Sequence, residues 1–249
     1  MSEKQIHIQR EMSGGSKLKA YCDLVVGKPG FGALLKYECI TFFSTYVPGA
    51  LGLFLRSKLY PFLLGECGRG CVFGYGVVLR HPHKIRLGEG TVVDDQVLLD
   101  AKGSQNAGIS VGKGGFLGRN SILSCKNGDI VLGDRVNIGF NSEVFSGSKV
   151  VFGDDCLLAA YTYVVGGGHR FEDAGTSVLD QEHVSEGITL GDGVWLGAGV
   201  KVMDGTQIGS GTIVGAGGVV TKSLPEQVIA AGVPAKVMRQ RTLEDAVTD

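Results

Sequence analysis

The sequence predicts an all-β protein in which short parallel strands wind into a solenoid behind a helical segment. Glycine supplies 41 of the 249 residues, more than twice its usual share of about 7%. A period of six, which fits neither a helix nor a single long strand, runs through the aliphatic residues Leu190, Leu196, Val202, Ile208, Val214 and Val220. Small and turn-forming residues fill the spacers, so the pattern indicates short strands separated by sharp corners.

The composition excludes several classes of protein. With 43% hydrophobic residues, the chain can bury a sizeable core. Its formal net charge is −1, and it has no basic stripe for nucleic acid. The six cysteines are scattered and the start MSEKQIHIQREM lacks a signal-peptide hydrophobic stretch, so reduced thiols in the cytoplasm are expected. The one close pair, in CGRGC, has a longer spacer than most zinc ribbons, and no metal is expected.

Residues 1–69 form the first predicted unit, a helical segment. The stretch ALLKYECITFFSTYVPGALGLFLRSKLYPFLLG is strongly apolar, but two prolines and two basic residues interrupt its second half. A spanning helix needs about 20 predominantly apolar residues in succession. The segment therefore predicts two short helices, at roughly 33–46 and 49–64, rather than one that crosses a membrane.

Two interpretations of this segment stay open. The helices can cap the open end of the solenoid, which would otherwise expose core residues and the end of a sheet. They can instead form an interfacial pair that contacts a membrane through residues 33–64, with Arg56 and Lys58 facing the lipid headgroups. The predicted location is cytoplasmic, with peripheral contact on the inner face of the membrane as the alternative.

Residues 70–239 form the predicted solenoid, and residues 240–249 form a tail, with a short C-terminal helix expected near this end. A coil of three hexads has about 18 residues. Successive strand starts are further apart in the sequence than this, so extra residues leave the solenoid in each coil. The longest excursion is the predicted loop at residues 166–187. The starts are Ile85-x-Leu87-Gly88, Ile109-x-Val111-Gly112, Ile130-x-Leu132-Gly133, Val150-x-Phe152-Gly153 and Ile188-x-Leu190-Gly191.

Two blocks of the sequence resemble the hexapeptide-repeat O-acetyltransferases, most nearly the galactoside, maltose, xenobiotic and polysaccharide-modifying enzymes. The blocks are FGDDCLLAAYTYVVGGGHRF and LGDGVWLGAGVKVMDGTQIGSGTIVGAGGVVTKSLPEQVIAAGVPAKVMRQR, and the resemblance covers about residues 70 to 239. It implies a left-handed parallel β-helix, acetyl-CoA as the acyl donor and a homotrimer with active sites between subunits. The left hand is taken from the family, because parallel crossovers are otherwise right-handed.

The same resemblance implies that His169 is the catalytic base. Transfer of an acetyl group from a thioester to a sugar hydroxyl needs a base that works near neutral pH, and imidazole meets this need. From its spacing alone, His169 could equally be an exposed loop residue. His183, the second histidine of the excursion, is the second candidate for the base, although the family pattern gives it no role. The acidic residues Glu172, Asp173 and Glu182 are candidates to orient an imidazole or to contact the acceptor. Backbone N–H groups at the glycine corners are expected to stabilise the oxyanion.

Further residues match the contacts of the family to the donor and the acceptor. Trp195 resembles the residue that packs on the pantetheine arm, with core or interface packing as its alternative role. The other expected donor contacts are Ala198, Gly199, Ala216, Thr221, Lys222, Lys236 and Arg239, of which the three cations would bind phosphates. Asn141 and Glu172 are the expected acceptor contacts. The aspartate that some sugar acetyltransferases carry in this region is absent, so galactoside-like specificity does not carry over.

The sequence thus predicts an acetyl-CoA-dependent O-acetyltransferase that acts on a hydroxyl of a sugar or cell-surface glycan precursor. A non-catalytic scaffold of the same fold is one alternative, and a serine O-acetyltransferase or amino-sugar N-acetyltransferase is another. A γ-class carbonic anhydrase is excluded, because the five histidines do not have the spacing of three converging zinc ligands.

Overall fold

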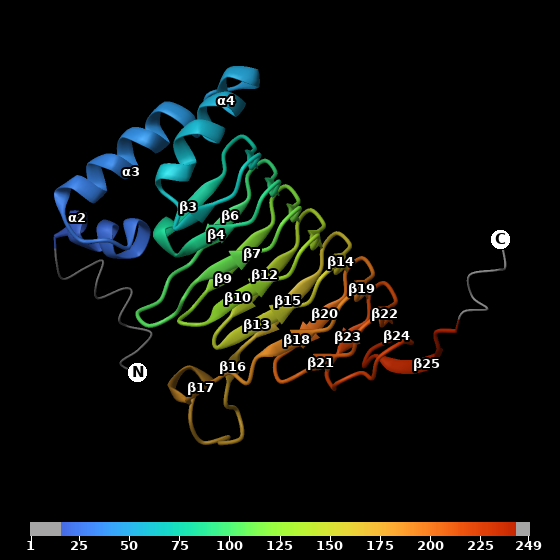
Figure 1. Ribbon diagram of the computed structural model, residues 1–249. Coiled ribbons are helices and arrows are strands. Elements are labelled where there is room, and N and C mark those ends of the chain that lie inside the picture. Colours follow the sequence, from blue (N-terminus) through green and yellow to red (C-terminus); the bar gives the residue numbers. More distant parts are fainter. Residues whose placement is uncertain (1–15, 243–249) are drawn as a thin grey trace.

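Three parallel sheets wind around one core in the computed structural model, which describes residues 16–242 (Figure 1). Sheet A contains β1 (Glu66–Cys67), β4 (Ile85–Leu87), β7 (Ile109–Val111), β10 (Asp129–Leu132), β13 (Lys149–Phe152), β18 (Ile188–Leu190) and β21 (Gln207–Ile208). Sheet B contains β2 (Val72–Phe73), β5 (Val92–Val93), β8 (Phe116–Leu117), β11 (Asn137–Ile138), β14 (Leu157–Leu158), β19 (Trp195–Leu196), β22 (Ile213–Val214), β24 (Val228–Ala231) and β25 (Lys236–Gln240). Sheet C contains β3 (Val78–Arg80), β6 (Leu98–Asp100), β9 (Ile122–Cys125), β12 (Glu143–Ser146), β15 (Tyr163–Gly166), β20 (Lys201–Met203) and β23 (Val219–Val220).

The chain visits the sheets in the order A, B, C and then returns to A, so each coil has three corners. We name these corners the A/B, B/C and C/A edges of the solenoid. The 3-10 turn η3 (Pro82–Lys84) joins β3 to β4 at the first C/A corner. Because consecutive coils stack in register, residues at the same corner of neighbouring coils lie above one another along one edge.

The strand register confirms the coil boundaries that the sequence predicts. Val111 pairs with Leu87 and with Leu132, and Phe152 pairs with Leu132 and with Leu190. These five residues are the second aliphatic positions of the predicted strand starts, so each start pairs with the next one along the chain. After the longest excursion, Leu190 pairs with Ile208, a single coil of three hexads later. The parallel solenoid is therefore confirmed, and its left-handed winding stays a prediction.

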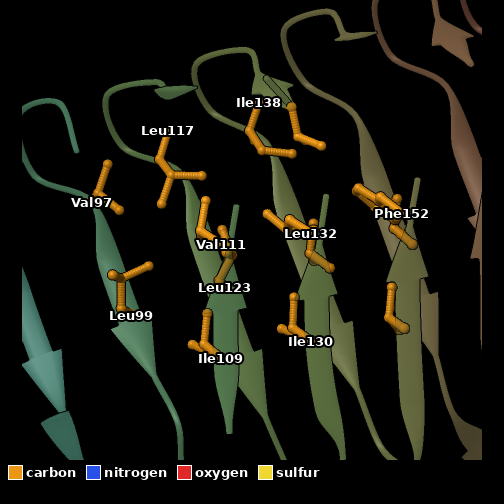
Figure 2. Packing of buried hydrophobic residues seen from close by; sticks show 14 of the residues in the cluster. Val97, Leu99, Ile109, Val111, Leu117, Leu123, Ile130, Leu132, Ile138 and Phe152 are labelled. Atoms are coloured by element: carbon orange, nitrogen blue, oxygen red, sulfur yellow. The ribbon is translucent and has the colours of Figure 1, made fainter. Parts of the chain in front are cut away.

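The core is a stack of inward-facing aliphatic side chains. The six repeat residues named above are all at most 2% exposed, and Figure 2 shows the same stacking earlier in the solenoid, where Leu117 and Ile138 come from successive coils. Small residues at the corners let neighbouring coils approach each other. At Gly197, an added Cβ atom would lie 2.6 Å from the backbone nitrogen of Ala216, so glycine is required there.

Left-handed backbone conformations form a ladder along the B/C edge. One residue of each coil has φ between +55° and +71° at this corner: Gly76, Gln96, Asn120, Asn141, Tyr161, Gly199 and Gly217. From the second coil on, each donates its N–H group to the preceding coil, as Asn141 does to the Arg119 carbonyl at 3.0 Å. Asn141 thus has a structural role, because asparagine adopts this conformation more readily than most residues.

The helical segment packs on the first coil of the solenoid (Figure 1). It contains α2 (Lys17–Tyr21), the π-helix η1 (Cys22–Val26), α3 (Phe31–Ser44), α4 (Gly49–Leu59) and the 3-10 turn η2 (Tyr60–Phe62). The Tyr37 hydroxyl donates to the Leu79 carbonyl at 2.8 Å, and the ring of Tyr60 meets Phe73 edge-on at 5.2 Å. The helices expected at 33–46 and 49–64 correspond to α3 and α4. Among residues 16–242, no helix is long and apolar enough to cross a bilayer.

The location of Arg56 corrects one expectation about this segment. Its side chain is 2% exposed and donates hydrogen bonds to the carbonyls of Phe73, Ser44 and Val47 at 2.8 to 3.0 Å. The guanidinium therefore joins α4 to the end of α3 and to β2, and it cannot face lipid headgroups. Its neighbour Lys58 is exposed, as expected.

Two segments of the predicted solenoid, the excursion and the C-terminal end, have structure that the sequence did not predict. The excursion leaves sheet C after β15 as a short hairpin of β16 (Gly168–His169) and β17 (His183–Val184), with the 3-10 turn η4 (Val178–Asp180) near its tip. At the other end, β25 turns back antiparallel to β24. The last described element is therefore a strand that ends at Gln240, and the expected C-terminal helix has no counterpart among residues 16–242. Residues 243–249 lie outside the described part of the chain.

Candidate active site

The excursion that carries His169 leaves the solenoid at the C/A edge through three glycines. An added Cβ atom at Gly166 would lie 2.8 Å from the side chain of Val150, and Gly167 has φ +149°, which other residues rarely adopt. A larger residue at either position would hinder the chain in leaving the coil. The glycine run therefore explains why the repeat stops where it does and places His169 at the start of the projecting hairpin.

His169 faces the second histidine of the excursion. The two residues are register partners in the β16 and β17 hairpin, and their ring centroids are 3.8 Å apart at an interplanar angle of 47°. His169 Nδ1 is buried and has no hydrogen-bond partner within residues 16–242. The structure thus brings together the two histidines that the sequence presents as separate candidates, and it leaves Nδ1 of His169 unpaired.

Hydrogen bonds and an ion pair stabilise the excursion beyond the two histidines. The Arg170 N–H donates to the Glu182 carbonyl at 2.9 Å, and their side chains form an exposed ion pair at 3.6 Å. Asp173 accepts from Gly175 and Thr176 and so forms the turn at the tip. Glu172 accepts from the N–H group of its neighbour Phe171.

These bonds correct the expectation that a carboxylate orients His169. Each of the three acidic candidates of the excursion bonds to another group, and the ring that contacts His169 is that of His183. Sequence reasoning could have found His183 only through the hairpin, because antiparallel pairing is what makes residues 169 and 183 neighbours.

Several of the expected donor contacts lie on or beside the outer face of sheet B. Trp195 is half exposed and begins a row of register partners across four neighbouring strands. The row continues through Ile213 and Ile229 and ends at Arg239. Three strand spacings of about 4.8 Å separate the first and last members of this row, roughly 14 Å in all. Lys236 lies on the same strand as Arg239. The row thus has an aromatic ring at one end and two cationic side chains at the other.

The small residues of the predicted donor site lie along the adjoining B/C edge. Ala198 and Ala216 are exposed at successive corners, and the Gly217 N–H group donates to the Ala198 carbonyl at 2.8 Å. The Gly199 N–H group donates to the Ala160 carbonyl. These two glycine N–H groups are therefore engaged between coils, which corrects the expectation that glycine corners of this kind stabilise an oxyanion.

The remaining expected residues lie elsewhere. Thr221 and Lys222 follow β23 at the C/A edge, the edge at which His169 also leaves the solenoid. Asn141 lies at the B/C edge with the small residues. Within one chain, the predicted site is thus divided into a C/A group around His169 and a sheet B group around Trp195.

Two observations concern other kinds of site. No group of three or more His, Cys, Asp or Glu side chains that could hold a metal ion occurs within the described part of the chain. A shallow depression lined by Thr189, Gln207, Ser210, Pro225 and Glu226 lies on the last coils. It contains none of the predicted site residues, and its open shape gives it no evident chemistry.

Comparisons with known proteins agree with the solenoid. Residues 187–222 match the family model described as bacterial transferase hexapeptide (six repeats). The chain is 30% identical over 137 residues to "Probable acetyltransferase Rv3034c" of Mycobacterium tuberculosis. The aligned region covers 55% of this chain and 46% of that protein. It is 36% identical over 120 residues to "Putative acetyltransferase YJL218W" of Saccharomyces cerevisiae, which covers 48% of this chain and 60% of that protein. The chain thus matches only about half the length of these curated relatives.

A solved structure shares the fold. AntD, an N-acyltransferase from Bacillus cereus in complex with dTDP and 3-hydroxybutyryl-CoA, superposes with a TM-score of 0.54. The match covers 82% of this chain and 94% of that chain at 16% sequence identity.

Proposed function

We propose that this chain is an acetyltransferase of the hexapeptide-repeat kind, in line with its partial matches to that family model and to two acetyltransferases, and that it transfers an acetyl group from acetyl-CoA to a hydroxyl of a sugar or glycan precursor. The observation that carries the proposal is the imidazole of His169, which the glycine run presents on a hairpin against His183 with Nδ1 unpartnered. An acyl-CoA is named as a ligand of the AntD structure, which has the same fold.

His169 acts as general base in this proposal. One imidazole nitrogen takes the proton of the acceptor hydroxyl as its oxygen attacks the thioester carbonyl, and the imidazolium then gives a proton to the departing thiolate. No bond forms between the acyl group and the protein. His183 holds the ring of His169 in position through their contact.

The site is completed by a second copy of the chain. The C/A group around His169 and the sheet B group around Trp195 lie on different parts of one solenoid. In a cyclic homotrimer, each interface brings one patch of a subunit against a different patch of the next. We therefore place the C/A edge of one subunit against sheet B and the B/C edge of its neighbour.

Two features of the excursion support a site between subunits. A buried imidazole nitrogen with no partner costs about 1–3 kcal/mol, so a group from a neighbour or from the acceptor that pairs with His169 Nδ1 would recover this cost. Phe171, Val178 and Leu179 are exposed on the projecting loop, and a neighbouring surface would cover them. Glu172 lies on the same loop and is the proposed acceptor contact.

The donor runs along the sheet B group. Trp195 packs on the pantetheine arm, Ala198, Gly199 and Ala216 leave room for it, and Lys236 and Arg239 bind the phosphates. Thr221 and Lys222, at the C/A edge, reach the donor from the neighbouring subunit. We propose a cytoplasmic location, because all six cysteines lie in the described residues and are free thiols.

The first test is calorimetric titration of the purified protein with acetyl-CoA, followed by assay of thiol release with a panel of hydroxyl and amine acceptors. We expect saturable binding of one donor per chain and turnover with a sugar hydroxyl. Turnover only with amines would replace the O-transfer proposal by N-transfer. No binding at millimolar donor would contradict the proposal and favour a non-catalytic scaffold.

The His169→Ala variant tests the base. We expect turnover to fall by about 10² to 10⁴ because proton transfer is lost in the transition state, while acetyl-CoA affinity stays within a few-fold. Calorimetry and thiol release on the same preparation separate the two effects. Turnover at the wild-type rate would remove His169 from the mechanism.

A further inference from the structure

The helices α3 and α4 expose a large apolar surface. Phe31 is 74% exposed and Phe42 is 79% exposed. The other exposed apolar side chains of this surface are Leu35, Phe43, Tyr46, Leu51, Leu53, Phe54 and Phe62. We call these nine residues the apolar face. Single exposed apolar residues are ordinary on protein surfaces, but nine of them on two packed helices and the turns that follow them favour an interaction site.

The helical period separates this face from the one that packs on the solenoid. Along α3, Phe31, Leu35 and Phe42 recur at spacings of four and seven, so they lie on one side of the helix. Leu34 and Tyr37 lie on the other side and are buried against the first coil. The helix therefore has two apolar sides, and the fold covers only one of them.

The helix α4 repeats this arrangement. Gly52 and Arg56 are buried toward the solenoid, whereas Leu51 and Phe54 are exposed on other sides of the helix. An added Cβ atom at Gly52 would collide with the Val47 carbonyl, so the buried side of α4 is already fully packed. Within residues 16–242, no element covers the apolar face.

Exposed lysines outnumber acidic residues in the helical segment. Five exposed lysines lie within residues 16–65: Lys17, Lys19, Lys28, Lys36 and Lys58. The acidic residues between α2 and α4 are only Asp23 and Glu38. The Lys58 ammonium lies 5.9 Å from the ring centroid of Phe54, so cation and aromatic ring are presented together. Aromatic and aliphatic side chains beside lysines are typical of segments that bind anionic membranes.

We propose that the apolar face of α3 and α4 docks in the headgroup region of an anionic phospholipid bilayer and holds the protein at the membrane surface. The helices lie at the end of the solenoid opposite β24 and β25 (Figure 1), so docking leaves the edges that carry the candidate active site uncovered. This inference does not depend on the acyl-transfer chemistry. In this proposal, residues 33–64 have both of the roles considered above. One side of the helices caps the solenoid, and the other side contacts the membrane.

Co-sedimentation of the full chain with lipid vesicles tests the proposal. We expect binding to vesicles that contain phosphatidylglycerol, weaker binding to pure phosphatidylcholine, and loss of the difference at high salt because the lysines are screened. The double variant Phe42→Ser with Phe43→Ser should bind roughly tenfold or more weakly, because it removes two exposed aromatic rings from the apolar face.

Matched variants separate docking from other effects. Met238→Ser removes an apolar side chain that is 68% exposed on β25 at the opposite end of the solenoid, and it should leave vesicle binding unchanged. Lys36→Glu with Lys58→Glu should weaken binding to anionic vesicles and leave binding to neutral ones unchanged. Melting curves of all variants should match the wild type, because none of these side chains is buried.

Three results would overturn the proposal. They are failure of the wild type to bind anionic vesicles, equal binding of the Phe42 and Phe43 double variant, and equal weakening by Met238→Ser. If the double variant instead lowers the oligomeric mass measured by light scattering, the apolar face is an interface between copies of this chain.

Discussion

At the residue scale, the contact between His169 and His183 is the main feature of the candidate site. The sequence offers the two histidines as separate candidates, and their separation along the chain suggests no contact. Pairing of β16 with β17 makes them direct neighbours with ring centroids 3.8 Å apart. A ring held on one side loses little further freedom when the acceptor binds, which favours its use as a base.

Substitution of His183 tests its role as a positioning residue. We expect His183→Ala to lower kcat by roughly tenfold with little change in KM, because the ring of His169 is then less well held. His183→Phe should restore much of the rate, since it keeps a ring in contact. The pH–rate profiles should distinguish positioning from proton transfer.

The control for this series is Glu182→Gln. It removes the exposed ion pair with Arg170, which contributes at most about 1 kcal/mol, and should leave the rate nearly unchanged. If His183→Phe is as impaired as His183→Ala and its basic limb in the pH profile disappears, His183 exchanges protons and is more than a positioning residue.

At the element scale, the junction between the helical segment and the first coil holds two neutral histidines. His81 is buried and its Nε2 lies 2.9 Å from the Asp23 carbonyl of η1. Desolvation lowers the pKa of His81, and desolvation together with the nearby Lys28 charge lowers the pKa of His83 to about 4. An added Cβ atom at Gly27 would lie 2.6 Å from the His81 ring, so the junction is closely packed.

The junction should therefore loosen in acid. A histidine whose folded pKa lies below its unfolded value of about 6.5 stabilises the fold fully above that pH. As the pH falls from about 6.5 to 4, the unfolded state takes up the protons and this stability is lost. Melting temperature against pH should fall in this window, and hydrogen exchange of residues 17–27 should rise first.

The His83→Gln variant serves as the control, because it cannot titrate in this range. Its melting temperature should depend less steeply on pH than that of the wild type. Equal slopes for the two proteins would show that His83 does not control acid sensitivity.

The same junction depends on the buried guanidinium of Arg56. It donates to three backbone carbonyls of α3, β2 and the turn between the helices. Arg56→Ala leaves these acceptors buried and unpaired, so the free energy of unfolding should fall by about 3 kcal/mol or more. Urea unfolding measures the change. Lys58→Ala, on the same helix but exposed, should change it by less than about 0.5 kcal/mol.

At the scale of the whole molecule, the division of the site between two edges determines how it can work. One solenoid cannot bring its C/A edge to its own sheet B, because the core separates them. A ring of identical subunits can bring these two surfaces together, because each subunit then places its C/A edge against sheet B of the next subunit. Oligomerisation is in this proposal a requirement of the chemistry.

Mixed oligomers test this proposal. His169→Ala inactivates the C/A group, and Ala198→Trp fills the space expected for the donor at the B/C edge. Each variant alone should be inactive. Co-expressed trimers should regain about a quarter of the wild-type activity, because one interface in four combines two intact halves. If both groups serve one chain, the mixture stays inactive, and a monomer in light scattering would equally contradict the proposal.

The sequence by itself determined the solenoid, its coil boundaries and the position of the excursion. The order of residues within each hexad predicts which side chain points inward and which corner needs a small residue. Leu190 is buried in the core, and Gly197 lies at a corner that has no room for a side chain. Because parallel coils stack one on another, this local rule also sets the register of distant residues. The candidate base and the small residues near the donor were selected by the resemblance of their sequence blocks to the family.

Only the tertiary structure decided what lies beside what. The repeat does not state which residues the excursion pairs, so the contact of His169 with His183 was missed. Both sides of α3 are apolar, and composition cannot tell which one the solenoid covers. The sequence does not show whether Arg56 is buried or exposed, because its carbonyl partners are brought together only by the fold. Local pattern fixes orientation relative to the core, whereas contacts between outward-facing groups depend on the complete fold.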